Sequence, residues 1–111
     1  MIEGLVKASS VQEALAYLAT HRGRAQLVAG GTQLMPLVES GEAMALCLVD
    51  ISGICALRRI AQEDGHLVMG SAVTLQMMVD HPLVHAEAPL LIEAIQQTRA
   101  SVQRDVATLG G

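Results

Sequence analysis

The feature that most constrains this fold is a short apolar stretch that runs into two consecutive glycines. Residues 27–34 read Leu-Val-Ala-Gly-Gly-Thr-Gln-Leu, so a strand over residues 25–29 gives way to a helix-compatible segment from Thr32 to about Val38. Glycines let the backbone approach a phosphate, and the free N–H groups and dipole of a helix start favour an anion there. Taken alone, the segment predicts either a phosphate-binding loop or a turn without a ligand.

The rest of the N-terminal half predicts the elements around this loop. Ser10 and Glu13 have the S-x-x-E spacing of a capping box, and apolar residues then recur at helical spacing until His21. Residues 45–49 are apolar throughout, as in a strand of a parallel sheet that is covered on both faces. With a first strand near residues 5–7, this half forms a small β-α-β-α-β lobe.

The pattern changes after Ile54. Residues 57–63 and 66–70 flank Asp64-Gly65, a dipeptide suited to a hairpin turn in which both central residues have positive φ. An antiparallel pair is therefore expected. The fold class that follows is α+β, with one lobe over residues 1–54 and the beginning of a second lobe over residues 55–111.

Short helices follow the hairpin. Thr74 caps a helix that continues to Val79 and that Pro82 must end, and Pro89 opens another helix. His81 and His85 lie close in sequence, but the proline interrupts the helical register that would bring them together, so no metal site is expected.

Composition excludes several classes of function. The chain has a formal net charge of −4, only seven Lys and Arg, and Tyr17 as its single aromatic residue among Phe, Trp and Tyr. It therefore lacks both the basic face and the stacking platforms of nucleic-acid binders. No apolar run approaches the ~20 residues that span a bilayer, and the first residues do not resemble a signal peptide, so a cytoplasmic protein is expected.

The remaining reactive side chains form no catalytic pattern. Cys47 and Cys55 lie in apolar surroundings without C-x-x-C spacing, which predicts buried structural thiols. No serine is paired by a motif with a histidine base, so no catalytic residue is predicted. A Rossmann dinucleotide domain is disfavoured because the first glycine loop lacks G-x-G-x-x-G spacing.

Residues 104–111, Arg-Asp-Val-Ala-Thr-Leu-Gly-Gly, form a second glycine segment, and two such loops can converge on one dinucleotide. Two further motifs precede it: Ala29-Gly30-Gly31-Thr32, and Met-Gly-Ser-Ala-Val-Thr at residues 69–74. In these three motifs the chain resembles the FAD-binding subunits of molybdenum hydroxylases, such as the xanthine dehydrogenase and carbon monoxide dehydrogenase types. Those subunits carry an Ala-Gly-Gly-Thr loop, an Ile-Gly-Ala-x-Val-Thr segment and an Arg-Asn-x-Ala-Thr-Ile-Gly-Gly-Asn stretch in this order. The match spans essentially the whole chain.

The resemblance implies the N-terminal part of a PCMH-type FAD-binding domain, about the first third of such a subunit. FAD would lie extended between the two lobes, with both glycine loops facing its pyrophosphate. The cofactor-binding residues carried over are Leu27, Val28, Ala29, Gly30, Gly31, Thr32, Gln33, Leu34, Thr108, Gly110 and Gly111, with Thr98 as a candidate on the flavin side. Asp105 replaces the family's asparagine, and pairing with Arg104 or Arg99 is expected to neutralise it.

The function implied is that of an FAD subunit in a molybdopterin-dependent dehydrogenase. Its flavin takes electrons that originate at a molybdenum centre and pass through iron-sulfur clusters, and passes them to an acceptor. The implied partners are a molybdopterin-binding large subunit and an iron-sulfur small subunit. The alternative is a truncated, non-catalytic remnant that folds without holding flavin. In either case we expect the isolated chain to self-associate and to be inactive alone.

Overall fold

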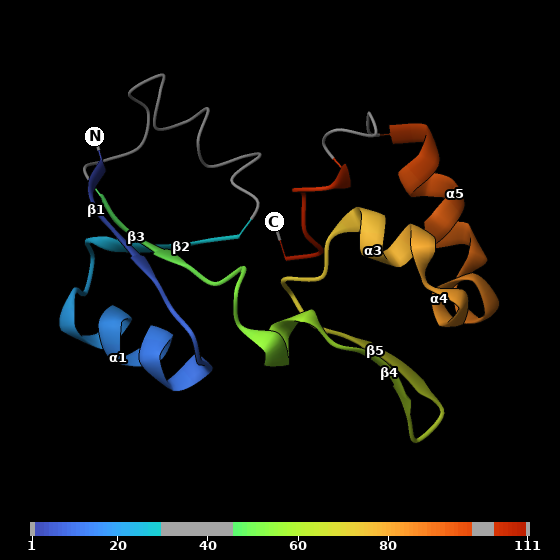
Figure 1. Ribbon diagram of the computed structural model, residues 1–111, viewed down its shortest axis with the longest axis horizontal. Coiled ribbons are helices and arrows are strands. Elements are labelled where there is room, and N and C mark those ends of the chain that lie inside the picture. Colours follow the sequence, from blue (N-terminus) through green and yellow to red (C-terminus); the bar gives the residue numbers. More distant parts are fainter. Residues whose placement is uncertain (1, 30–45, 99–103, 111) are drawn as a thin grey trace.

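The computed structural model describes residues 2–29, 46–98 and 104–110 of the 111-residue chain (Figure 1). The elements, in order, are β1 (Ile2–Lys7), α1 (Val11–Thr20), β2 (Ala25–Val28), β3 (Leu46–Asp50), the 3-10 helix η1 (Cys55–Arg58), β4 (Ile60–Glu63), β5 (His66–Met69), α3 (Leu75–Asp80), α4 (Pro82–Glu87) and α5 (Pro89–Thr98). The predicted helix over residues 32–38 lies outside the described residues.

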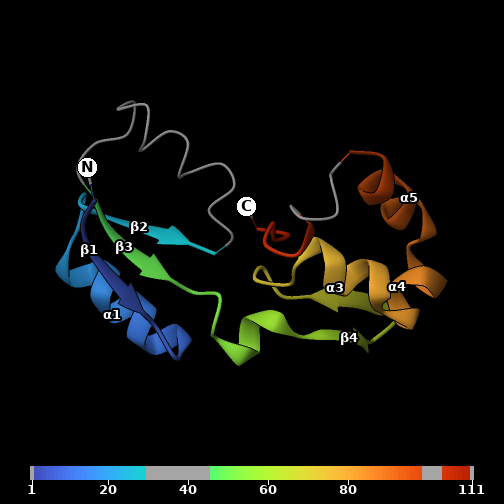
Figure 2. The same cartoon turned by 45° about the horizontal axis from the view of Figure 1, so that its top comes forward.

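The first lobe is built on a parallel sheet, as predicted. Its strand order is β1-β3-β2, with Leu5 opposite Leu48 and Leu27 opposite Val49 in the register. Helix α1 lies along one face of this sheet (Figure 2). Buried side chains of the helix, the strand and the following turn form one core, which comprises Ala8, Ala14, Val49, Ile51 and Ile54. Burial of this apolar surface is the main stabilising contribution to the lobe.

Helix α1 begins where the capping pattern predicts. Ser10 Oγ accepts a hydrogen bond from the backbone N–H of Glu13 at 3.1 Å. The return contact differs from a standard capping box, because the Glu13 carboxylate accepts from the Ser9 hydroxyl at 2.8 Å instead of binding the cap residue. At the other end the Tyr17 and His21 rings stack with their centroids 4.1 Å apart.

The second lobe begins with an antiparallel hairpin in which β4 pairs with β5. Asp64 and Gly65 have φ values of 51° and 79°, which confirms the predicted turn. The first strand begins at Ile60 rather than at Leu57, so the predicted start was wrong. The reason is local: the N–H of Leu57 donates to the carbonyl of Ile54 at 3.0 Å and closes a 3-10 turn.

Helix α4 packs against both strands of the hairpin, and α3 and α5 pack against α4 and against each other. Thr74 caps α3, with its hydroxyl accepting from the N–H of Met77 at 3.0 Å, as predicted. Pro82 ends α3 but also opens α4, a helix that the sequence analysis missed; a proline in a first helical turn needs no amide partner. The core of this lobe consists of Val73, Met78, Val84, Ile92 and Ile95.

The two cysteines do not match the expectation of buried thiols. Cys55 is exposed and Cys47 is half-buried. Cys55 opens η1, a single turn in which no residue is buried. Burial raises the pKa of the Tyr17 phenol above its ordinary value of 10.0, and the neighbouring Cys47 side chain raises it further.

Candidate cofactor-binding site

The strand β2 leads into the first glycine loop. Its pairing with β3 runs as far as Val28, and the N–H of Ile51 donates to the Val28 carbonyl at 2.9 Å. Ala29 follows and packs against the first core. In both ribbon views the carboxyl end of β2 points toward residues 104–110 of the second lobe (Figures 1 and 2). The parallel sheet therefore aims the start of this loop at the second glycine segment.

The predicted contacts of the first loop divide into two groups. Leu27 is exposed, whereas Val28 and Ala29 are half-buried. The other predicted contacts of this loop lie outside the described residues: Gly30, Gly31, Thr32, Gln33 and Leu34. Their roles stay predictions.

The second glycine segment is held by residues 71–75, which overlap the Met-Gly-Ser-Ala-Val-Thr motif at residues 69–74. Three backbone hydrogen bonds join the two: Leu75 N–H to the Ala107 carbonyl, Leu109 N–H to the Val73 carbonyl and Gly110 N–H to the Ser71 carbonyl, each at 2.9 Å. Thr74 and Thr108 form an antiparallel bridge between them. Two motifs that the sequence analysis read separately are therefore one structural unit.

Gly110 is required by this packing. A Cβ at this position would lie 2.9 Å from the Ser71 Cβ and 3.1 Å from the Ser71 carbonyl oxygen. Thr108 is 8% exposed, so its side chain is fixed by its surroundings. Gly111 lies outside the described residues, and Thr98 is the last residue of α5, with its side chain outside the described part.

Arg104 supplies a test of whether the segment suits an anionic cofactor. Its Nε is buried and, within the described ranges, has no hydrogen-bond partner. A buried donor without an acceptor costs about 1–3 kcal/mol, so such atoms are normally matched by a ligand, water or side chain. The residues present therefore fit a phosphate-bearing group near the second glycine segment.

The neighbouring carboxylate, Asp105, is predicted to pair with Arg104 or Arg99, and the structure describes the first of these two arginines. Asp105 is exposed, and in the part of the chain that the structure describes it forms no ion pair with Arg104. The buried Nε and the exposed carboxylate lie in different environments, which explains the absence of the pair. The second candidate partner, Arg99, lies outside the described residues.

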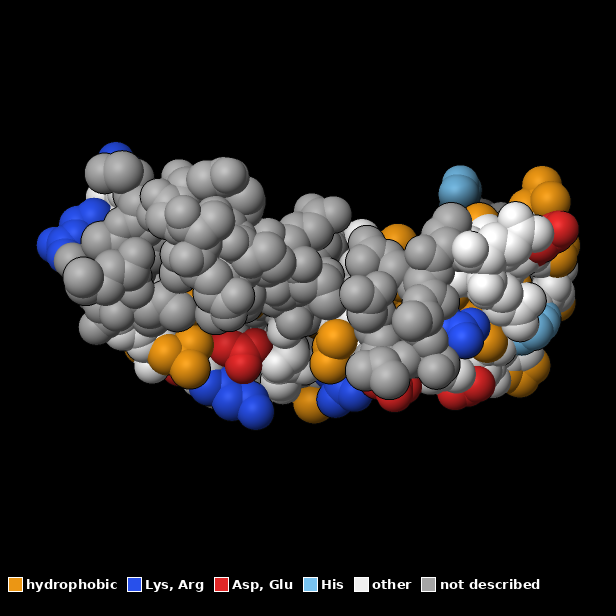
Figure 3. All heavy atoms as spheres, turned by 90° about the horizontal axis from the view of Figure 1, so that it is seen from above, with side chains coloured by type: hydrophobic (Ala, Val, Ile, Leu, Met, Phe, Trp, Pro, Cys, Tyr) orange, Lys and Arg blue, Asp and Glu red, His pale blue; other side chains and the backbone are white. Residues whose placement is uncertain are grey.

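The described surface carries mixed charge. On the face shown in Figure 3, acidic and basic side chains are interspersed, with no broad basic stripe among the described residues. Within those residues no group of three or more potential metal ligands is found, and no described helix is long and apolar enough to cross a membrane.

Comparisons with known proteins identify the family of the chain. The family model for the FAD binding domain in molybdopterin dehydrogenase matches residues 1–111. The chain is 35% identical over 102 residues to the carbon monoxide dehydrogenase medium chain of Hydrogenophaga pseudoflava, covering 92% of this chain. It is 32% identical over 106 residues to a putative xanthine dehydrogenase FAD-binding subunit of Escherichia coli K12, covering 95% of this chain. The chain spans 36% of the length of each relative.

Solved structures show the same fold. A cyanide-inactivated Cu,Mo-CO dehydrogenase superposes with a TM-score of 0.95 at 25% identity, over 100% of this chain and 39% of that one. Quinoline 2-oxidoreductase from Pseudomonas putida 86 gives a TM-score of 0.92 at 30% identity, over 97% of this chain and 38% of that one.

The fold and the match to this family model define a flavin-binding class of protein. More specifically, the chain belongs to the family of FAD-binding domains of molybdopterin dehydrogenases. The predicted family, the α+β fold class and FAD as the family's cofactor are confirmed.

Proposed function

We propose that this chain forms the pyrophosphate-binding part of an FAD subunit in a molybdenum hydroxylase-type oxidoreductase. The observation that carries the proposal is that the end of β2, at Val28 and Ala29, points toward the second glycine segment. Backbone hydrogen bonds hold that segment against residues 71–75. Two backbone segments that face each other from separate lobes can hold a dinucleotide by its central phosphates.

Each lobe would contribute its own set of FAD contacts. We assign the lobes, residues 1–54 and 55–111, as the two walls of the FAD site. The first wall would offer backbone groups of Leu27, Val28 and Ala29 together with Gly30, Gly31, Thr32, Gln33 and Leu34, and the second would offer Thr108, Gly110 and Gly111, with Thr98 toward the flavin. FAD supplies the redox chemistry when bound, whereas the chain binds and orients it.

The proposed role in the enzyme is electron transfer. Electrons would arrive from iron-sulfur clusters of a small subunit, having originated at a molybdopterin-binding large subunit, and would leave through FAD to an acceptor. Relatives named as a medium chain and as an FAD-binding subunit support a place in such a complex. The proposed location of the complex is the cytoplasm. Oxidation of the substrate would take place on the partner subunit, so this chain alone would be inactive.

The alternative function is a remnant that folds but does not hold flavin. Such a chain would bind FAD weakly or not at all.

An FAD titration separates the two proposals. Flavin fluorescence and calorimetry are followed for the purified chain and for a Gly31→Glu variant, which places a carboxylate in the first loop. Gly4→Glu is the matched control, because a Cβ at Gly4 meets nothing within 4 Å. Saturable binding that Gly31→Glu abolishes and Gly4→Glu retains supports the FAD subunit, and no binding by any of the three proteins supports the remnant.

A further inference from the structure

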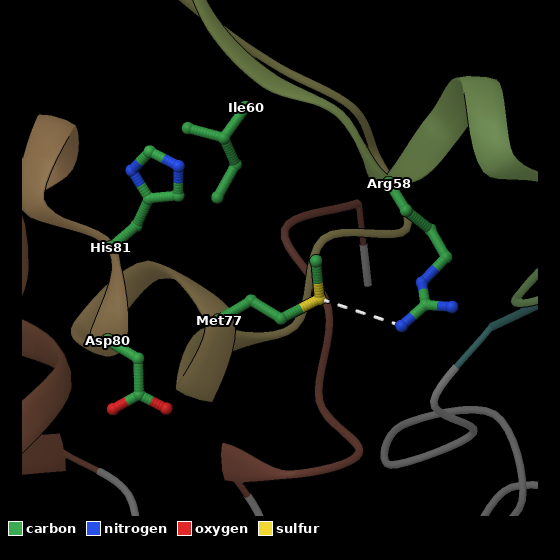
Figure 4. Close-up of a pocket in the computed structure, with 5 residues that line it drawn as sticks. All are labelled: Arg58, Ile60, Met77, Asp80 and His81. Carbon is green, nitrogen blue, oxygen red and sulfur yellow. Dashed lines mark hydrogen bonds between the residues drawn. The ribbon is translucent and has the colours of Figure 1, made fainter.

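The second lobe contains a pocket of about 350 Å³ whose described lining residues differ from those of the proposed FAD site (Figure 4). Its lining comes from the end of η1, the first residue of β4, and α3 with its C-terminal cap: Arg58, Ile60, Met77, Asp80 and His81. None of these residues belongs to residues 25–29 or 104–110. The volume lies within the usual range for sites that take small molecules.

One side of the pocket carries the guanidinium of Arg58, which has a single weak polar contact among the described residues. Arg58 Nη2 lies 3.9 Å from Met77 Sδ, and among the described residues this weak acceptor is its one polar partner. The adjacent Arg59, by contrast, is paired with Glu63. A guanidinium offers parallel N–H donors that match the two oxygens of a carboxylate. The end of the pocket at Arg58 is therefore suited to a carboxylate.

The other side of the pocket is formed by Asp80 and His81, and the Asp80 carboxylate makes it negative and able to accept hydrogen bonds. Asp80 Oδ1 accepts from Gln76 Nε2 at 3.0 Å, which leaves further lone pairs on the carboxylate. His81 Nδ1 accepts from the N–H of Leu83 at 3.2 Å, so the neutral ring carries its hydrogen on Nε2. In Figure 4 Asp80 and Arg58 lie on opposite sides of Met77. A ligand group near Asp80 would be an ammonium or another strong donor.

Apolar side chains separate the two polar ends. Ile60 and Met77 are both half-buried and pack against the second core. An unbranched thioether adapts its shape to a flat apolar body and contacts aromatic rings favourably. We propose that this pocket binds a small amino-carboxylate with an apolar body: its carboxylate on Arg58, its body over Ile60 and Met77, and its ammonium at Asp80.

Three matched probes test the two-ended site by calorimetry and by chemical shifts in the purified chain. They are 4-(aminomethyl)benzoate, which has both charged groups, 4-methylbenzoate, which lacks the ammonium, and benzylamine, which lacks the carboxylate. We expect the first to bind most tightly. Loss of a charge-assisted contact corresponds to a weakening of roughly 10–100-fold.

Variants assign each end. Arg58→Gln should weaken both carboxylate probes and leave benzylamine unchanged, whereas Asp80→Asn should weaken both amine probes and leave 4-methylbenzoate unchanged. Arg59→Gln is the matched control, because its guanidinium is paired outside the pocket. Circular dichroism verifies that each variant is folded.

Several results would overturn the proposal. Absence of saturable binding of every probe at millimolar concentration would do so, and so would equal losses in Arg58→Gln and Arg59→Gln, which would indicate only general charge attraction. Displacement of 4-(aminomethyl)benzoate by FAD would reassign the pocket to the flavin site. Gly31 is not among the described lining residues of the pocket, so loss of FAD binding in Gly31→Glu together with retained probe binding would separate this proposal from the proposed function.

Discussion

The backbone of Gly110 lies directly on Ser71, with its N–H donating to the Ser71 carbonyl at 2.9 Å and no room for a Cβ between the two residues. This contact joins the second glycine segment to the middle family motif. The position of the proposed phosphate-binding backbone on the second lobe therefore depends on Gly110 in two ways. Its missing side chain leaves room for Ser71 as well as for a ligand.

Gly110→Ala is predicted to push the second segment away from Ser71. Overpacking of this kind costs about 1–3 kcal/mol, which urea unfolding would measure. FAD affinity should fall with it. Gly4→Ala is the control, since open space surrounds that position; equal stability changes in the two variants would show that the contact with Ser71 is unimportant.

Gly70→Ala is predicted to be more damaging than Gly110→Ala. A Cβ at Gly70 would overlap the carbonyl oxygen of Leu57, which is backbone and cannot rotate away. The Leu57 carbonyl also accepts from the N–H of Ala72 at 2.9 Å, so the substitution should break that bond too. We expect a loss of more than about 3 kcal/mol or a failure to fold. A melting temperature within a few degrees of the parent would contradict this.

Thr74→Ala is predicted to destabilise α3 by about 1 kcal/mol, because the N–H of Met77 loses its capping hydroxyl. Thr74→Ser keeps the hydroxyl and should recover most of the loss. The measurement is the free energy of unfolding from urea titrations of the three proteins. Equal loss in the serine and alanine variants would assign the effect to the missing methyl group instead.

Tyr17 is predicted to make stability fall in alkaline solution. Burial, and then the contact with Cys47, raise the pKa of its phenol above 10.0, so the folded state holds this proton more tightly than the unfolded chain. The resulting stabilisation is complete below pH 10 and is lost as pH rises through the folded pKa. Tyr17→Phe should remove this part of the alkaline loss. A constant difference in unfolding free energy between the two proteins from about pH 8 to 11 would contradict it.

Local signals in the sequence predicted much of the fold. Ser10 and Thr74 cap helices where their spacing indicated, and Asp64-Gly65 forms the turn that its conformational preference requires. These features depend on residues within a few positions of one another, so a sequence carries them directly.

The misses have physical causes. Pro82 was read as a stop for one helix although it also opens the next, because proline is compatible with both roles. The pairing of Ser71 with Gly110 joins residues far apart in sequence, and no local pattern reports such a contact. Among the predicted cofactor contacts, Thr108 and Gly110 are positioned by the pairing of their segment with residues 71–75. The resemblance identified these two residues but did not explain what positions them.

The most direct test of the central claim compares FAD with riboflavin in the same calorimetric titration of the purified chain. Riboflavin has the same ring system but lacks the pyrophosphate and the adenosine. If two glycine segments hold the pyrophosphate, FAD binds saturably, riboflavin does not, and ADP competes with FAD. Equal affinity for FAD and riboflavin, or FAD binding that ADP leaves unchanged, would contradict the account.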